Sequence, residues 1–178
     1  RLQRRERMLT RRQQAVTEAP AAPALSKPET RKPVTKVVRP VVASTLDVLV
    51  AEDNDVNQIV FSQILQGTGL RFQIVNNGKK AVAAWEEHNP AVILMDVSMP
   101  VMNGHQATQL IREREEEAGD GRHVPIVGVT AHAQESDRER CLEVGMDDYV
   151  SKPISPELLE AKLKQWLGEN AIPRAGAI

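Results

Sequence analysis

The stretch VILMDVSMP, residues 92–100, decides how this sequence folds. Four apolar residues run directly into the carboxylate of Asp96, without the alternation of polar and apolar residues that a strand with one solvent-facing side shows. A continuous apolar run of this length is typical of a strand buried on both faces, as in a parallel sheet covered by helices. In such sheets, functional groups stand just beyond the carboxyl ends of the strands. Asp96 is therefore predicted to stand at a functional edge.

Strand and helix patterns alternate along the chain on both sides of this stretch. The predicted strands cover residues 46–51, 71–75, 91–95, 125–131 and 147–151. The predicted helices cover residues 56–66, 78–88, 104–117, 134–144 and 156–167, the last one opened by Ser155 and Pro156. Right-handed crossovers make such a (βα)5 chain a parallel sheet with helices on both sides. We therefore predict a flavodoxin-like, doubly wound α/β fold with strand order 2-1-3-4-5.

Local patterns add detail to three of these elements. The first helix should end before Gly67 and should pack through an apolar face made of Val56, Ile59, Val60 and Ile64. Residues 115–122 are acidic and rich in glycine, which favours a loop. The helix at 134–144 is mostly polar and is expected to be the least firmly docked.

Charge and composition divide the 178 residues into unlike parts. Residues 1–45 carry 11 basic and 3 acidic side chains, a net charge of +8, whereas residues 46–178 carry a net charge of −9. Prolines recur through residues 17–45, a composition that cannot form a core and favours a semi-rigid linker. The predicted organisation is the end of an upstream helix at 1–16, a linker at 17–45, a folded domain at 46–168 and a flexible tail at 169–178.

Several classes of protein are excluded by the composition. Cys141 is the only cysteine, so the chain has no internal disulfide and fits a reducing, cytoplasmic location. No apolar run is long enough to span a membrane, so this fragment is expected to make no membrane contact, although the parent protein could be attached to one. The arginines of residues 1–16 lack interleaved aromatic residues, and we expect no contact with nucleic acid.

Five functional groups follow the predicted strands and should meet at one rim of the sheet. They are Glu52, Asp53, Asp96, Thr130 and Lys152. Three adjacent carboxylates repel one another, so either one holds a proton or a cation lies among them. Carboxylates together with water are the ligands typical of Mg²⁺. A hydroxyl and an ammonium opposite such an ion would neutralise a phosphoryl group during its transfer to Asp96, the nucleophile.

Four segments resemble the signatures of response-regulator receiver domains, of the type carried at the C-terminus of hybrid sensor histidine kinases. They are VLVAEDNDVNQ (48–58), VILMDVSMPVMNG (92–104), PIVGVTAHA (125–133) and GMDDYVSKPI (145–154). No single segment is decisive, but their order and spacing on a (βα)5 pattern are specific. The resemblance covers about residues 46–168, nearly all of the predicted folded domain.

The resemblance implies a phosphoacceptor site that uses Mg²⁺. Asp96 resembles the residue that accepts a phosphoryl group from a phosphohistidine. Asp53 resembles the direct Mg²⁺ ligand, together with Asp96 and the backbone carbonyl of Ser98, and Glu52 resembles the acid that acts through water. Lys152 resembles the lysine that binds the phosphoryl group, and its bond to the following proline is expected to be cis.

The resemblance also implies a switch. Thr130 resembles the hydroxyl that turns toward the phosphoryl group, and Tyr149 resembles the aromatic residue that swings inward after it. Phosphorylation is then expected to remodel the face formed by the helix at 134–144, the strand at 147–151 and the last helix. Ser98 and His132 stand two residues after Asp96 and Thr130, beside the path of the hydrolytic water, so both are predicted to tune hydrolysis. His132 could order that water or block it.

The implied partners are a histidine kinase domain, of the same or a neighbouring chain, and a histidine phosphotransfer protein. A homodimer through the switching face is a further expectation. We expect no stand-alone enzyme beyond Mg²⁺-dependent self-phosphorylation and dephosphorylation, within a parent histidine kinase. One alternative is a docking module that works without phosphorylation. Another is a phosphatase of the haloacid dehalogenase type, but that chemistry needs a second carboxylate where Ser98 stands.

Overall fold

The computed structural model describes residues 44–132 and 134–172. Five parallel strands form one sheet in the order β2-β1-β3-β4-β5, which confirms the predicted fold. The strands are β1 (Val48–Ala51), β2 (Phe72–Val75), β3 (Val92–Asp96), β4 (Ile126–Thr130) and β5 (Asp148–Ser151). The predictions for residues 1–16, for nearly all of the linker and for the end of the C-terminal tail lie outside the described residues.

The sheet is buried at its centre and half-buried at one edge. Every residue of β1, β3 and β4 is buried, as their uninterrupted apolar runs indicate. Strand β2 pairs only with β1 and is half-buried throughout, which agrees with its more polar sequence. The register places Ala51 opposite Met95 and Asp96 opposite Val129, so the last residues of neighbouring strands end at one level.

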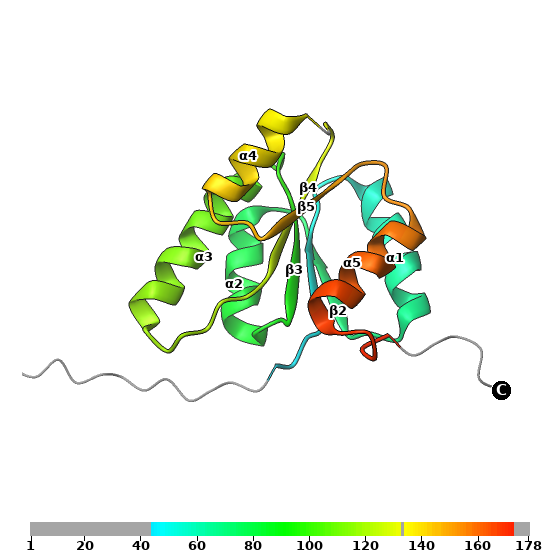
Figure 1. The fold of residues 1–178 in the computed structure, drawn as a ribbon, viewed down its shortest axis with the longest axis horizontal. Helices are drawn as coiled ribbons and strands as arrows, with labels where there is room; N and C mark the ends of the chain where they lie inside the picture. The colour runs from blue at the N-terminus through cyan, green and yellow to red at the C-terminus, as the bar shows by residue number, and fades with distance from the viewer. Residues whose placement is uncertain (1–43, 133, 173–178) are drawn as a thin grey trace, which may run out of the picture. The chain divides into compact units, whose positions relative to one another are not determined.

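Helices cover both faces of the sheet (Figure 1). Helices α2 (Gly78–His88), α3 (Gly104–Ala118) and α4 (Glu135–Glu143) lie on one face, and α1 (Asp55–Thr68) and α5 (Pro156–Leu167) lie on the other. Each face has its own core, because side chains alternate across a strand. Leu49, Ile93 and Ile111 belong to the first core, and Val50, Phe61 and Leu94 belong to the second. None of the helices in the described part of the chain combines the length and the apolar character needed to cross a bilayer.

The predicted apolar face of α1 was partly wrong. Phe61 and Leu65 face the core, whereas Val56 and Ile59 are 67% and 57% exposed. Ile59 lies two residues before Phe61 and so points to the opposite side of the helix. The predicted end was also wrong, because the helix continues past Gly67 to Thr68. Gly69 follows as its left-handed cap, with a φ of 71°. Helix α1 therefore leaves two large apolar side chains in solvent near its N-terminus.

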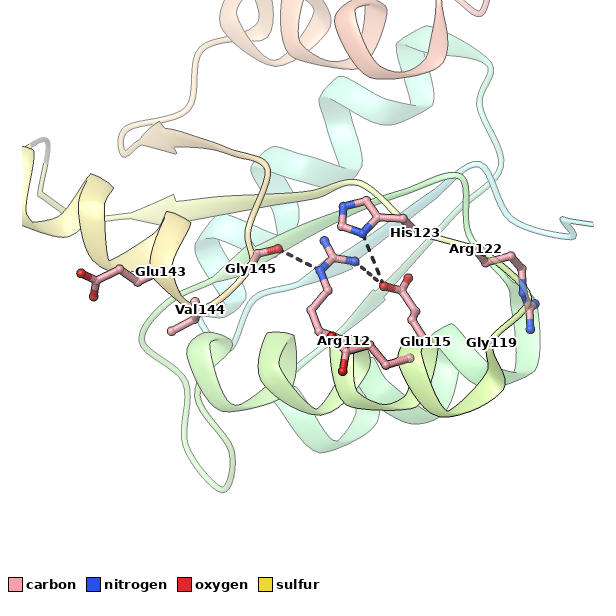
Figure 2. A pocket seen from close by; sticks show the side chains of 10 residues that line it. Arg112, Glu115, Gly119, Arg122, His123, Glu143, Val144 and Gly145 are labelled. Atoms are coloured by element: carbon pink, nitrogen blue, oxygen red, sulfur yellow. Dashed lines mark hydrogen bonds and ion pairs between the residues drawn. The ribbon is translucent and has the colours of Figure 1, made fainter. Parts of the chain in front are cut away.

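The loop predicted from residue 115 was wrong at its start, because α3 continues to Ala118. The acidic pattern suggested solvent, but the Glu115 side chain is buried and accepts hydrogen bonds from the Val124 N–H at 2.7 Å and from Arg112 at 2.7 Å. Arg112 also donates to Asp147 at 2.8 Å and to the Gly145 carbonyl at 2.9 Å. Figure 2 shows Arg112, Glu115 and Gly145 of this cluster, which line a pocket of about 650 Å³. Side-chain hydrogen bonds thus fix the end of the sheet opposite the predicted site.

Helix α4 has a single buried side chain, that of Cys141. Its N-cap residue, Gln134, makes no side-chain capping hydrogen bond. Its C-terminal end is held more firmly, because the Met146 N–H donates to the Cys141 carbonyl at 3.0 Å and Arg112 holds Gly145. The single buried side chain agrees with the weak apolar anchoring that the polar sequence of this helix indicates.

Candidate functional site

The carboxyl ends of the strands bring two of the predicted carboxylates, those of Glu52 and Asp96, into contact with Lys152. Glu52 follows β1, Asp96 ends β3, Thr130 ends β4, and Lys152 follows β5. The Lys152 Nζ atom lies 2.8 Å from Asp96 Oδ2 and 2.9 Å from Glu52 Oε2. Asp96 is 3% exposed and Glu52 is fully buried, so two carboxylates that are shielded from water share the single positive charge of one ammonium. The peptide bond between Lys152 and Pro153 is cis, as predicted.

Burial and hydrogen bonding set the protonation behaviour of this cluster. Burial raises the pKa of Asp96 above the ordinary aspartate value, and the nearby Glu52 charge adds to this effect. Hydrogen bonds from Lys152 and from the Ser98 N–H, the latter 3.0 Å long, oppose the rise. Burial also acts against the Lys152 ammonium, but its contacts with the Asp96 and Glu52 carboxylates prevail and raise the pKa of Lys152.

Three carboxylates of the rim fit a hard divalent cation. Glu52, Asp53 and Asp96 each offer an oxygen within 4.8 Å of the other two. Glu52 Oε2 accepts no well-directed hydrogen bond although it is buried and near Lys152. The Asp53 carboxylate is exposed and makes no hydrogen bond or ion pair with the described residues. Such oxygen donors are the ligands that Mg²⁺ prefers, and the structure therefore brings the predicted ligand carboxylates together.

The acidic cluster opens onto a groove of about 690 Å³. Asp53 and Ser98 line its end near the carboxylates, and His105 and Arg140 line it toward α3 and α4. Gly104 allows α3 to begin directly against the end of β3, because a side chain at this position would collide with the Asp96 carbonyl. The Gly104 N–H donates to the Val97 carbonyl at 3.1 Å and fixes this approach.

The predicted switch residues lie near the cluster but are not joined to it. The Thr130 hydroxyl donates to the His132 carbonyl, and the His132 N–H donates back to that hydroxyl, each at 3.2 Å. Tyr149 is half-buried, and the Arg138 guanidinium lies 5.9 Å from the centre of its ring. The His132 side chain is exposed. The switch roles of Thr130 and Tyr149, the tuning roles of Ser98 and His132, and the ligand role of the Ser98 carbonyl stay predictions.

The residues that hold Glu52 were not predicted from the sequence. The Asn57 amide and the Asn54 N–H both donate to Glu52 Oε1, and the Gln58 amide donates to the Glu52 carbonyl. All three lie in the segment EDNDVNQ. A local signal existed for Asn54 alone, because asparagine is a favoured N-cap residue and so indicates where the helix begins.

Comparisons with known proteins agree with this geometry. The family described as "Response regulator receiver domain" matches residues 48–164. The chain is similar to hybrid signal transduction histidine kinase I of Dictyostelium discoideum, with 47% identity over 132 residues, which are 69% of this chain and 8% of that protein. It spans only 8% to 13% of the length of the first curated relatives it matches, all of them histidine kinases.

Two solved structures are informative. One is the receiver domain of a sensor histidine kinase from Pseudomonas aeruginosa, which has a magnesium ion coordinated in its active-site cleft. It is 41% identical, with a TM-score of 0.62, over 69% of this chain and 98% of the other. The second is the receiver domain of the yeast response regulator Ssk1, crystallised with the histidine phosphotransfer protein Ypd1 from Saccharomyces cerevisiae. It is 30% identical, with a TM-score of 0.65, over 74% of this chain and 95% of the other.

Proposed function

The chain belongs to the response regulator receiver domain family, and from this premise we propose that it accepts a phosphoryl group on Asp96 within a phosphorelay. One observation carries the assignment to Asp96. Its carboxylate is almost completely buried at the end of β3, 2.8 Å from the Lys152 ammonium and within 4.8 Å of two further carboxylates. A buried nucleophile beside a fixed cation is the arrangement that phosphoryl transfer requires.

The transfer step needs only a nucleophile and compensation of charge. An Asp96 oxygen attacks the phosphorus of a phosphohistidine, and the phosphorus–nitrogen bond breaks with its electron pair going to the ring nitrogen. The histidine leaves as neutral imidazole when its other ring nitrogen carries a proton. Lys152 neutralises charge on the transferred oxygens, and Thr130 can donate its hydroxyl hydrogen to them.

We propose that Mg²⁺ is the cation of this site. Asp53 and Asp96 would hold it directly, the Ser98 carbonyl would complete the protein ligands, and Glu52 would act through water. The bound ion would supply positive charge to the phosphoryl oxygens. The acidic cluster of this chain and the magnesium in the related Pseudomonas receiver support this assignment.

The proposed donor is a histidine kinase domain, and the proposed second partner is a histidine phosphotransfer protein that exchanges the phosphoryl group with Asp96. The parent protein is proposed to be a hybrid sensor histidine kinase, since the first curated relatives are histidine kinases. The test is to mix the chain with a phosphorylated histidine phosphotransfer protein and Mg²⁺, and to follow the label on both proteins. Loss from the donor with equal gain by this chain supports the proposal. Persistence of the donor label, when the same chain accepts from a small acyl phosphate, would contradict the proposed class of partner.

Docking of that partner is proposed at the N-terminal part of α1. Val56 and Ile59 are exposed apolar side chains close to Asp53 along the chain, whereas most of the apolar side chains of α1 are buried or half-buried. We expect Ile59→Glu to slow phosphotransfer from a histidine phosphotransfer protein by about tenfold, because an apolar contact at an interface is replaced by a charge. The rate with a small acyl phosphate should stay unchanged.

The matched control for this docking surface is Ala83→Glu, which introduces the same charge at an exposed apolar position of α2, on the other face of the sheet. Its phosphotransfer rate should equal that of the native chain. Equal rates for native chain and Ile59→Glu with the protein donor would show that the partner docks elsewhere.

His132 is proposed to tune the lifetime of the phosphorylated state. Its backbone is bonded to the Thr130 hydroxyl, and its side chain is exposed beside the site. His132→Ala is expected to change the dephosphorylation rate, because it removes the side chain that would order or block the hydrolytic water. The rate is measured as loss of label over time. A rate equal to that of the native chain would exclude this role.

Signal output is proposed through the α4-β5-α5 face, with a homodimer as one outcome. Helix α4 has only one buried side chain, so its repacking breaks few contacts. A docking module that works without phosphorylation is less favoured, because the complete set of acids, hydroxyl and lysine lies at one rim. The haloacid dehalogenase alternative lacks its second carboxylate, since Ser98 stands at that position.

A further inference from the structure

The two oxygens of the Glu52 carboxylate contact different partners. Its Oε1 atom accepts a hydrogen bond from Asn57 Nδ2 at 3.2 Å and another from the Asn54 N–H at 3.1 Å. Its Oε2 atom faces Lys152 Nζ at 2.9 Å without a well-directed hydrogen bond. The two oxygens of one fully buried carboxylate therefore have different tasks, one fixed by the β1–α1 segment and the other turned toward the acidic cluster.

The first turn of α1 builds the holding side. The Asn54 side chain caps the helix and accepts the N–H groups of Val56 and Asn57, at 3.0 Å and 3.2 Å. This cap fixes where the helix begins, and Asn57 then reaches back five residues to Glu52. The Gln58 amide donates to the Glu52 main-chain carbonyl at 2.7 Å and fixes the backbone at the same residue.

Asn57 supplies the only side-chain hydrogen bond that the described structure gives to Glu52 Oε1. Without it, Oε1 would keep only the Asn54 N–H, and the ion pair of Oε2 with Lys152 would be the main side-chain contact that orients the carboxylate. The position of Glu52 in the cluster, where three carboxylate oxygens lie within 4.8 Å, would then be less fixed. Residues that orient metal-binding groups in this way commonly alter metal affinity by about 10- to 100-fold when they are replaced.

We propose that Asn57 is a positioning residue of the phosphoryl-transfer site, which keeps Glu52 Oε2 turned toward the divalent cation and its water. The inference rests on the proposed function, since it concerns the same acidic cluster. Asn57 touches neither the acceptor carboxylate nor the exposed Asp53 in any hydrogen bond of the described residues, so its effect would pass through Glu52 alone.

The test compares Asn57→Leu, which removes the amide at similar volume, with Asn57→Gln, which retains an amide donor. The affinity for Mg²⁺ is measured by calorimetric titration without any phosphoryl donor, and the phosphorylation rate is measured with a small acyl phosphate over a range of Mg²⁺. We expect Asn57→Leu to weaken Mg²⁺ binding by about tenfold. The phosphorylation rate of Asn57→Leu should also fall by about tenfold at limiting Mg²⁺ and return to within about threefold of the native rate at saturating Mg²⁺. Asn57→Gln should recover part of the lost Mg²⁺ affinity.

Gln66→Leu is the matched control. It also removes an amide hydrogen bond from α1, that between Gln66 Nε2 and Ser62 Oγ, and it is exposed. It should bind Mg²⁺ as the native chain does. Native Mg²⁺ affinity in Asn57→Leu, or equal losses in Asn57→Leu and Asn57→Gln, would overturn the proposal. Failure of the proposed function is distinct, since the native chain would then bind Mg²⁺ in the titration but acquire no phosphoryl group.

Discussion

Asp96→Asn is expected to abolish phosphorylation of the chain completely. The amide has no carboxylate oxygen to attack phosphorus. The other buried carboxylate beside Lys152, that of Glu52, has its Oε1 atom already bonded to the Asn54 N–H and the Asn57 amide. The shape of the site should be kept, because asparagine is nearly isosteric and Lys152 retains its contact with Glu52 at 2.9 Å. Intact mass after incubation with a small acyl phosphate, with and without Mg²⁺, measures the result.

The native chain should gain one phosphoryl group, and only when Mg²⁺ is present. Asp120→Asn provides the matched control, because Asp120 is a surface aspartate paired with Arg122 in the loop after α3, away from the strand ends that carry the site. It should be phosphorylated as the native chain is. An adduct on Asp96→Asn of the same size and Mg²⁺ dependence would place the acceptor on another residue.

Lys152→Met is expected to produce the second-largest change, in stability as well as in rate. The ammonium is shared by two buried carboxylates, so its removal leaves both without a partner charge. Breaking a buried ion pair from one side costs about 3 kcal/mol of the free energy of unfolding, measured without Mg²⁺ by denaturant titration. Loss of a fixed cation beside the transferred group should also slow phosphorylation by about 100-fold.

The pH dependence of this loss follows from the raised pKa of Lys152. A lysine whose pKa is higher in the folded chain than in the unfolded chain stabilises the fold fully below the unfolded value. That contribution is lost as the pH rises through the folded value, above 10.5. The stability difference between native chain and Lys152→Met should therefore be complete at neutral pH and shrink in strong alkali.

Lys162→Met separates the two effects of that variant. Lys162 is also partly buried and forms an ion pair with Asp148 at 2.6 Å, but it lies on α5 outside the site. Its replacement should cost stability and leave the phosphorylation rate unchanged. A Lys152→Met chain that is phosphorylated at the native rate would show that the lysine serves the fold alone.

The position of the site could be predicted from the sequence because its cause is local. A continuous apolar run that ends in Asp96 indicates a buried strand, and parallel strands place their carboxyl ends at one rim. Strand order then brings Glu52, Asp53 and Lys152 to Asp96 without knowledge of any distance. The sheet order and the polar edge strand β2 followed from the same alternation of patterns.

The details that were wrong or missed depend on contacts between distant residues. The apolar residues of α1 are spread around the helix, so periodicity alone could not tell that Phe61 and Leu65, and not Ile59, face the sheet. The acidic end of α3 is helical because Glu115 is bonded to Val124 after a turn of the chain. Asn57 was missed because an amide in a helix carries no charge pattern that points to a carboxylate five residues earlier.

Among the described residues, the Asp53 carboxylate has no hydrogen bond or ion pair, and this has a thermodynamic consequence. Its charge lies within 4.8 Å of oxygens from Glu52 and Asp96, which share the single positive charge of Lys152. Folding therefore concentrates like charges that the unfolded chain keeps apart, and this repulsion lowers the stability of the domain. A divalent cation binds the folded chain in preference to the unfolded one, so its concentration shifts the folding equilibrium by mass action. Part of the affinity for the ion is then relief of a repulsion that the fold itself creates, and the same carboxylates that make the domain reactive make its stability depend on the ionic composition around it.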